Sequence, residues 1–236
     1  MSGEGDSSTV EMVAGESAAA AVADLSQDPL VVFCDGVVMS ILGKLDVRSL
    51  AVACVVCTRW LTVASTDRLW GPKCQELWLG KAHLPRISKV RGLAEMTATS
   101  LSIMDGKRIR ITRNDMCDHA WEFHFTAAAP AYWRNLDPYW GADGAPMRRY
   151  FHDDGSVTAD PDDKVWGGHE SSYTVVTGLL ADNKMREHYV RINRWPQMSV
   201  QRKPDWSWEL ANHLYSYSSI PDAEKEDGTG PFVPMF

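Results

Sequence analysis

The stretch Trp121-Glu122-Phe123-His124-Phe125 alternates large apolar and polar side chains over five consecutive positions. Successive side chains of a β-strand point to opposite faces of a sheet, so the alternation predicts a strand with one buried and one exposed face. Residues 206–210 follow the same pattern, and residues 173–176 and 189–192 are rich in the aromatic and β-branched side chains that strands favour. Together these segments predict a β domain in the C-terminal half of the chain.

Turn signals separate the predicted strands. Asp-Gly, Gly-Gly and Pro-Asp pairs recur between residues 105 and 222, and such pairs favour tight turns between antiparallel strands. We therefore expect a mainly antiparallel sheet that closes as a barrel or folds over as a sandwich. The domain is also aromatic-rich, because 19 of the 23 Phe, Trp and Tyr residues lie between Trp121 and Phe236.

Upstream of this domain the spacing of apolar residues becomes helical. Asp46 is suited to cap a helix over about residues 47–56, since its carboxylate can accept from the free N–H groups of a first turn. The helix before it carries five apolar residues on one face. They are Val37, Val38, Ile41, Leu42 and Leu45. The fold class is therefore expected to be α+β, a small helical unit followed by the β domain.

Composition divides the chain into four parts. Residues 1–28 hold six acidic residues, no Lys or Arg and no aromatic residue, so we expect a disordered acidic tail that buries too little apolar surface to fold. The helical unit is expected at 29–79 and the β domain at 101–236. Between them Pro85 interrupts the chain, and residues 80–100 are expected to form a partly helical connecting segment.

Charge and cysteine content narrow the class of protein. Most of the net charge of −7 lies in the tail, and the remainder carries a net −1 without a basic stripe, so no nucleic-acid partner is expected. No apolar run approaches the roughly 20 residues that cross a bilayer, so no membrane partner is expected. Five scattered cysteines and the lack of a signal-like N-terminus favour a reducing compartment, the cytoplasm or the nucleus.

The helical unit also matches a sequence pattern that is typical of one family of small helical modules. That pattern runs approximately L-P-x-E-x-x-x-x-I-L, then L-x-x-x-x-L, then V-C-x-x-W, then L-W. Its counterparts here are Phe33-Cys34-Asp35-Gly36, Ile41-Leu42, Leu45, Leu50, Val56-Cys57-Thr58-Arg59-Trp60 and Leu69-Trp70. In this register the segment resembles an F-box, the module by which substrate receptors attach to cullin-RING ubiquitin ligases.

The resemblance implies a non-catalytic receptor subunit that binds a Skp-type adaptor and, through it, a cullin-RING ligase. The sequence departs from the pattern at Phe33-Cys34, which replaces Leu-Pro, and at Gly36, which replaces Glu, so the entry to the first helix lacks a preset backbone and a favourable charge. The residues expected to face the adaptor are Phe33, Val37, Val38, Ile41, Leu42, Leu45 and Leu50.

An alternative is that these apolar residues belong to the core of the helical unit. For Leu45 and Leu50 the two interpretations are equally supported. Trp60 and Trp70 are expected in the core, because burying so large an aromatic side chain removes about 150 to 250 Å² from water.

Cys54 and Cys57 form a C-x-x-C, the spacing of redox dithiols and of half a zinc site. A catalytic dithiol needs an exposed first cysteine at a helix N-terminus, and a structural zinc needs two further ligands. Because Cys54 and Cys57 end an apolar helical run and no second pair follows, we expect both to be packed residues.

Other clusters of reactive side chains are weaker. Cys117-Asp118-His119 with His124 has metal-ligand types, but His124 lies opposite the face of Trp121, so a solvated or satisfied histidine is favoured. The acid pairs 153–154 and 162–163 lie beside Gly or Pro, where Asp is common in turns. No nucleophile elbow, dinucleotide fingerprint or P-loop occurs. No catalytic residue, metal or cofactor is predicted.

Residues 132–140, Tyr-Trp-Arg-Asn-Leu-Asp-Pro-Tyr-Trp, concentrate four aromatic side chains without strand or helix periodicity. Aromatic residues with arginine are typical of interface anchors, so Trp133, Arg134, Tyr139 and Trp140 are candidates for target binding, the alternative being burial in the sheet core. A second set of candidates for target binding is basic and could bind an acidic degron or a phosphate group. The alternative is that these arginines are solvated strand residues. The set consists of Arg148 and Arg149, with Arg191 and Arg194.

These features favour a substrate-recognition subunit of an SCF-type ubiquitin ligase, whose F-box docks the adaptor and whose β domain binds an unidentified target protein. One alternative is a β module that binds a sugar or another ligand through its aromatic faces. Another is an adaptor-binding protein that acts outside a ubiquitin ligase.

Overall fold

The computed structural model describes residues 28–86, 93–141, 144–165 and 171–221. The chain divides into two compact units, Met1–Lys73 and Cys74–Phe236, which are described separately below. The predicted acidic tail lies, except for Asp28, outside the described residues. The predicted limits of the domains stay predictions.

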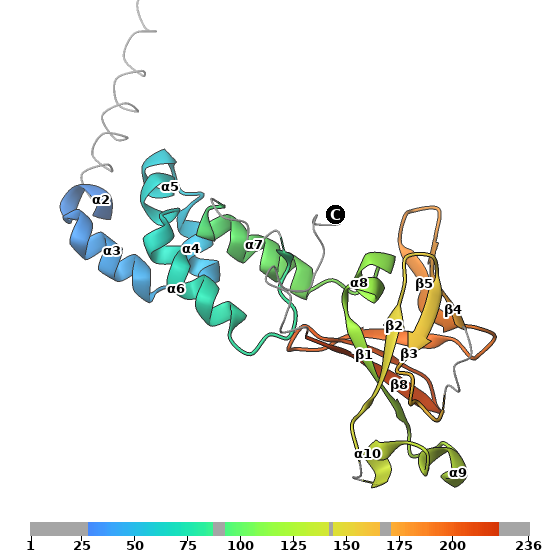
Figure 1. The fold of residues 1–236 in the computed structure, drawn as a ribbon. Coiled ribbons are helices and arrows are strands. Elements are labelled where there is room, and N and C mark those ends of the chain that lie inside the picture. Colours follow the sequence, from blue (N-terminus) through green and yellow to red (C-terminus); the bar gives the residue numbers. More distant parts are fainter. Residues whose placement is uncertain (1–27, 87–92, 142–143, 166–170, 222–236) are drawn as a thin grey trace, which may run out of the picture. The chain divides into compact units, whose positions relative to one another are not determined.

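The first unit is helical (Figure 1). Asp46 caps a helix as predicted, because its Oδ1 accepts from the backbone N–H of Ser49 at 2.8 Å. The hydrogen bonds to this carboxylate lower the pKa of Asp46. The helices are α2 (Pro29–Val32), α3 (Asp35–Lys44), α4 (Val47–Ala53), α5 (Thr58–Ala64) and α6 (Asp67–Trp78), the last of which continues into the second unit.

Apolar side chains from four of these helices form the core of the first unit. Leu42 of α3 and Leu50 of α4 are buried, as are Leu69 and Trp70 of α6. The indole of Trp70 donates to the carbonyl of Ala64 at 2.6 Å, so its polar atom is satisfied. Burying a side chain such as Leu stabilises the folded state by about 1.5 to 3 kcal/mol.

The second unit is built on a closed antiparallel barrel in which each strand pairs with the next and β8 pairs with β1 (Figure 1). The prediction of an α+β fold is confirmed, and of the two sheet forms expected the barrel is the one found. The strands are β1 (Ala120–Phe125), β2 (Met147–Phe151), β3 (Ser156–Ala159), β4 (Ser171–Leu179), β5 (Met185–Ile192), β6 (Met198–Arg202), β7 (Trp208–Ala211) and β8 (Tyr215–Ile220).

Alternation along the strands fills the barrel with apolar side chains. In β1, Trp121, Phe123 and Phe125 are buried, while Glu122 and His124 are partly exposed, as the alternation predicted. The predicted strand at 206–210 is shorter, because Trp206 lies in the turn before β7 with a φ of 65°. The core of the unit is drawn from residues 111–217 and is rich in edge-to-face aromatic pairs.

The two ends of the barrel carry different helices (Figure 1). The pairing of β1 with β8 places Phe125 opposite Tyr215 at one end and Ala120 opposite Ile220 at the other. Helix α8 (Arg113–Asp118) directly precedes β1 at the Ala120 end. Helices α9 (Ala131–Arg134) and α10 (Pro138–Gly141) follow β1 at the Phe125 end, which we call the barrel mouth. Helix α7 (Glu95–Gly106) precedes α8 in the chain.

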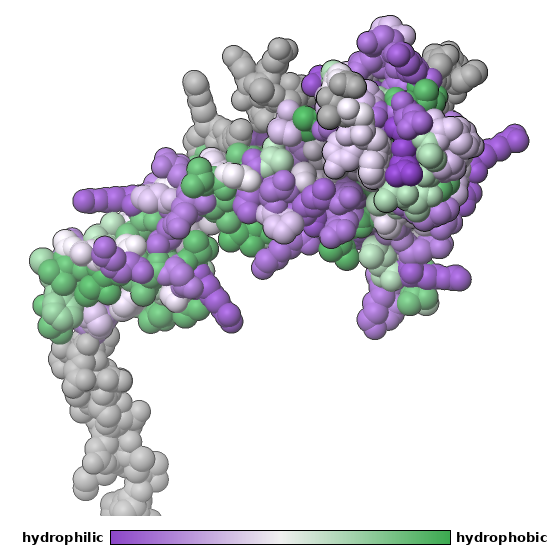
Figure 2. Space-filling view, turned by 90° about the horizontal axis from the view of Figure 1, so that it is seen from below, coloured by the Kyte–Doolittle hydropathy of each residue, from purple (hydrophilic) through white to green (hydrophobic). Residues whose placement is uncertain are grey.

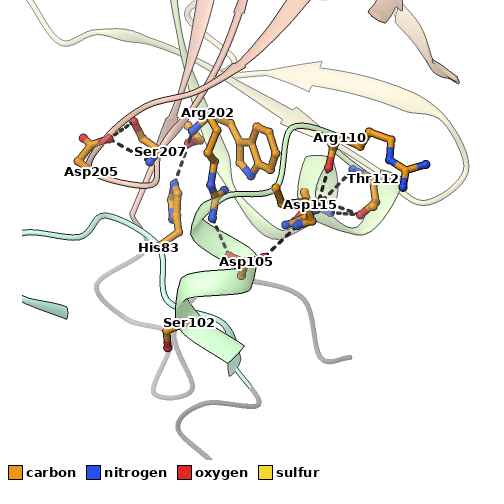
Figure 3. A network of polar contacts seen from close by, with 12 residues as sticks. His83, Ser102, Asp105, Arg110, Thr112, Asp115, Arg202, Asp205 and Ser207 are labelled. Carbon is orange, nitrogen blue, oxygen red and sulfur yellow. Dashed lines mark hydrogen bonds and ion pairs between the residues drawn. The ribbon is translucent and has the colours of Figure 1, made fainter. Parts of the chain in front are cut away.

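A buried network of charges joins α7 and α8 to the barrel (Figure 3). The guanidinium of Arg108 contacts Asp115 at 2.6 and 2.7 Å and Asp105 at 2.9 Å. Arg202 of β6 binds the other oxygen of Asp105 at 2.7 Å. Both guanidinium groups lie over the ring of Trp208, at 5.1 and 4.3 Å from its centroid. Burial lowers the pKa of Arg202 to about 10, so this arginine stays charged at neutral pH.

His83 fixes the segment after α6 to the same end of the barrel (Figure 3). Its Nε2 lies 2.7 Å from Oγ of Ser219, and that hydroxyl also accepts from the backbone N–H of Trp208 at 2.7 Å. The ring of His83 stacks on the ring of His119 with 3.9 Å between centroids. Burial, and secondarily the charge of Arg202, lower the pKa of His83 to about 4, so its ring is neutral at pH 7.

Candidate functional site

Helix α3 presents an exposed apolar stripe. Phe33, which precedes the helix, is 47% exposed, and Val37 and Ile41 are 43% and 51% exposed. The spacing of four residues places Val37 and Ile41 on one face of α3, and Phe33 lies two residues before the helix in extended backbone. Large apolar side chains that stay in water on and just before one helix are an expected feature of a surface that binds a partner.

The structure sorts the seven predicted adaptor-facing residues into three groups, which are exposed, half-buried and buried. Phe33, Val37 and Ile41 are exposed, and Leu45 is half-buried. The rest are buried in the helical core: Val38, Leu42 and Leu50. Of the two tryptophans expected in the core, Trp70 is buried and Trp60 is half-buried with its indole donating to Asp28 at 3.2 Å.

Further apolar residues of the helical unit, which were not predicted to face the adaptor, are also exposed. Figure 2 shows hydrophobic side chains, in green, over the helical unit. The sequence indicates that some apolar residues must stay exposed, because the helical unit holds more of them than short helices can bury. It does not indicate which residues these are. They are Val31, Val32, Val52, Val55, Val56 and Leu61.

The interpretation of the C-x-x-C as a packed pair is wrong for Cys57. Helix α4 ends at Ala53, so Cys54 is its C-terminal cap and Val55 and Val56 lie in the turn. Cys57 is exposed as the N-terminal cap residue of α5. Cys54 is half-buried, and burial raises the pKa of its thiol. Among the described residues there is no group of three or more His, Cys, Asp or Glu side chains that could hold a metal ion.

The barrel mouth brings the predicted aromatic residues together. Asp137, which is buried, accepts from the backbone N–H groups of Phe125 at 2.9 Å and Tyr139 at 3.0 Å. The indole of Trp140 donates to the carbonyl of Phe125 at 2.8 Å. These bonds tie the segment of α9 and α10 to the end of β1. The segment lacks periodicity because each of its helices has only four residues.

Trp133 and Arg134, the other predicted residues of this segment, lie in α9 and make aromatic contacts at the barrel mouth. The ring of Trp133 packs on Phe125 and on Trp195, with centroid distances of 5.7 and 6.4 Å. The guanidinium of Arg134 lies 5.1 Å from the ring centroid of Trp140. The mouth thus gathers all four predicted aromatic-segment residues and adds Trp195, which comes from the turn between β5 and β6.

An apolar cavity of about 230 Å³ lies at the barrel mouth. Its described lining has no charged side chain. The aliphatic residues of the lining are Leu136 and Val165. The aromatic residues of the lining are Phe123, Phe125, Trp133, Trp195, Tyr215 and Tyr217.

The predicted arginine set is not gathered on one surface, because Arg148 and Arg149 are neighbours in β2 and point to opposite faces. Arg148 is exposed, whereas Arg149 is buried inside the barrel, pairs with Asp163 and lies 4.8 Å from the ring centroid of Phe123. Asp163 also accepts from the backbone N–H of Val165 at 2.8 Å, so it has the predicted turn role and a charge partner as well. Arg191 and Arg194 are exposed.

None of the helices in the described part of the chain combines the length and the apolar character needed to cross a membrane.

A comparison with protein-family models finds a match to the helical part of the chain. Residues 35–76 match the family model described as F-box-like. The chain therefore carries an F-box-like domain, and the resemblance seen in the sequence is confirmed. Searches of curated proteins and of solved structures found no match to the chain. The family match ends at residue 76 and does not extend over the barrel.

Proposed function

We propose that this protein is a non-catalytic substrate-recognition subunit of an SCF-type ubiquitin ligase, acting in the cytoplasm or the nucleus. The F-box-like domain binds a Skp-type adaptor and, through it, the cullin and RING subunits. The barrel domain binds the protein to be ubiquitinated. The observation that carries the proposal is the exposed stripe of Phe33, Val37 and Ile41 within or next to the residues that match the F-box-like model.

Adaptor binding is tested by changing exposed residues only. Val37→Asp and Ile41→Asp place charges on the stripe without entering the core, since both side chains are exposed. Burying an unpaired carboxylate at an interface is strongly unfavourable. We expect each variant to reduce co-purification of the adaptor at least tenfold.

Ile109→Asp is the matched control, because Ile109 is an equally apolar and exposed residue outside the F-box-like domain. It should leave adaptor binding unchanged. Adaptor binding that survives both stripe variants would exclude this surface as the docking site. Adaptor binding without cullin in the same complex would instead favour an adaptor-binding protein that acts outside a ubiquitin ligase.

Target recognition is tested with the ligase assembled and the proteasome inhibited. Proteins enriched by the full chain but lost with Tyr139→Ala or Trp195→Ala are the expected targets, because both side chains are exposed at the barrel mouth. The same variants should still bind the adaptor. Targets retained at wild-type levels by both variants would place target binding elsewhere on the barrel.

A further inference from the structure

The chemistry of the cavity at the barrel mouth restricts what it can hold. Six aromatic and two aliphatic side chains line it, and the described lining carries no charge. Transfer of a charged group into such a site without a partner is very costly. The charge of Arg149, which lies over the lining residue Phe123, is already paired with Asp163. The cavity therefore suits an uncharged, mainly apolar group.

The size of the cavity indicates a single side chain. Pockets for small ligands commonly measure about 300 to 1,000 Å³, and this one measures about 230 Å³. The lining rings already pack edge to face, for example Phe123 on Tyr217 at 5.1 Å and Trp195 on Tyr215 at 6.1 Å between centroids. An additional aromatic ring gains from the same geometry.

The rim of the cavity indicates that its occupant belongs to a protein. Tyr132, Leu136, Tyr139, Trp140 and Trp195 are exposed around the mouth. Aromatic residues are enriched at the centres of protein interfaces, and contiguous exposed apolar surface marks such sites. A small molecule held in the cavity would leave Tyr132, Tyr139 and Trp140 in water, because these three are not part of the lining. A protein that inserts one side chain would cover them as well.

We propose that the barrel mouth is a socket for one uncharged aromatic side chain of the target protein. The side chain enters beside Trp133 and Trp195 and rests on Phe123 and Tyr217, while the exposed rim packs against the surrounding surface of the target. This inference rests on the proposed function, since it names the feature by which the barrel recognises its target.

The first test uses the full chain bound to its adaptor, with isotope-labelled Leu and Val methyl groups. Leu136 and Val165 are the two aliphatic residues of the lining, so their methyl signals report on the cavity directly. Titration with N-acetyl-tryptophanamide and N-acetyl-phenylalaninamide should shift both signals in a saturable way. N-acetyl-leucinamide should bind at least tenfold more weakly, and N-acetyl-aspartate amide should not shift them. Equal shifts with all four probes would overturn the proposal.

The second test fills the cavity. Val165→Phe adds a ring to the lining, and Leu180→Phe is the matched control, because Leu180 is exposed and lies after β4 outside the lining. Only the first should abolish binding of the tryptophan amide. Peptides selected from a random library on the wild-type complex should share one aromatic position and should lose at least tenfold in affinity for Val165→Phe.

Three outcomes would contradict the inference while leaving the proposed function open. Selected peptides without a common aromatic residue would exclude a side-chain socket. Free indole that binds while no aromatic peptide competes would indicate a small-molecule site. Binding that appears only after residues 222–236 are removed would assign the cavity to the chain's own C-terminal segment. Adaptor co-purification, measured in parallel, reports separately on the proposed function.

Discussion

At the scale of single residues, Gly106 makes room for the buried ring of Trp206. Trp206 has a φ of 65°, a conformation that bulky residues rarely adopt, and its ring is nevertheless buried. A Cβ atom on Gly106 would lie 2.4 Å from Nε1 and 2.5 Å from Cε2 of this ring. The missing side chain at the end of α7 therefore makes room for the indole.

We predict that Gly106→Ala lowers the free energy of unfolding by about 1 to 3 kcal/mol, the usual cost of forcing extra atoms into a packed site. Gly36→Ala is the control, since an added Cβ there meets nothing within 4 Å. Because Ala favours helix over Gly, this control should stabilise the protein by up to about 1 kcal/mol. Denaturant unfolding of both variants checks the prediction, and equal effects would contradict it.

The ion pair inside the barrel gives a second prediction for single residues. Arg149 and Asp163 are both buried, so Asp163→Ala leaves a cation in an apolar interior. We expect a loss of about 3 to 5 kcal/mol in the free energy of unfolding. The double variant Arg149→Met with Asp163→Ala should recover most of it, because the unpaired charge is gone.

The exposed pair of Lys184 with Asp182 serves as the control for this experiment. Solvent screens such pairs, so Asp182→Ala should produce no measurable change in stability. A double variant at Arg149 and Asp163 that is no more stable than Asp163→Ala would show that the buried charge is not the source of the loss.

At the scale of elements, His83 makes the attachment of the segment after α6 sensitive to pH. A folded pKa of about 4 against an ordinary value of 6.5 means that the folded state holds the ring neutral. Its contribution to stability is complete above pH 6.5 and is lost as the pH falls to 4, because the unfolded chain takes up the proton first. The loss amounts to about 3 kcal/mol.

We therefore expect the free energy of unfolding to decrease between pH 6.5 and 4 more steeply in the wild type than in His83→Gln. Glutamine keeps a polar partner for Ser219 but does not titrate. Burial and the charge of Arg202 oppose the charged ring, and together they outweigh Asp205 and Asp115, which favour it. Denaturant unfolding across this pH range measures the slopes, and identical slopes would rule out His83 as the group responsible.

The sequence predicted those helices and strands whose apolar periodicity extends over enough residues to be recognised. The alternation in β1 is visible because one face meets the core and the other meets solvent. The same reasoning placed Trp206 in a strand, whereas it lies in a turn, and its ring packs against Gly106, a hundred residues away in the chain. The one-turn helices α9 and α10 have no period, so only their aromatic composition was informative.

The candidate sites were predicted in part for a similar reason. Val37, Val38, Ile41 and Leu42 form one broad apolar face of α3, and sequence alone does not tell which edge of that face is buried. Tertiary packing decides it: Val38 and Leu42 are buried, and Val37 and Ile41 stay in water. The cavity could not be predicted, because its lining comes from residues 123–217 that only closure of the barrel brings together.

At the scale of the whole molecule, the two units should respond differently to the adaptor. The barrel has its own core, drawn from residues 111–217. The helical unit is short and keeps a large apolar surface in water, so much of its stability should come from its partner. A ligand present at 100 times its dissociation constant stabilises the state that it binds by about 2.7 kcal/mol.

We predict that saturating adaptor slows amide hydrogen exchange about 100-fold in α3, α4 and α5 and leaves the strands of the barrel unchanged. Ile41→Asp should remove this protection, because it disrupts the exposed stripe without entering the core. Val165→Phe should retain it, since Val165 lies at the barrel mouth. Equal protection of helices and strands would contradict the prediction. It would mean that the adaptor stabilises the whole chain as one cooperative unit and not the F-box-like domain alone.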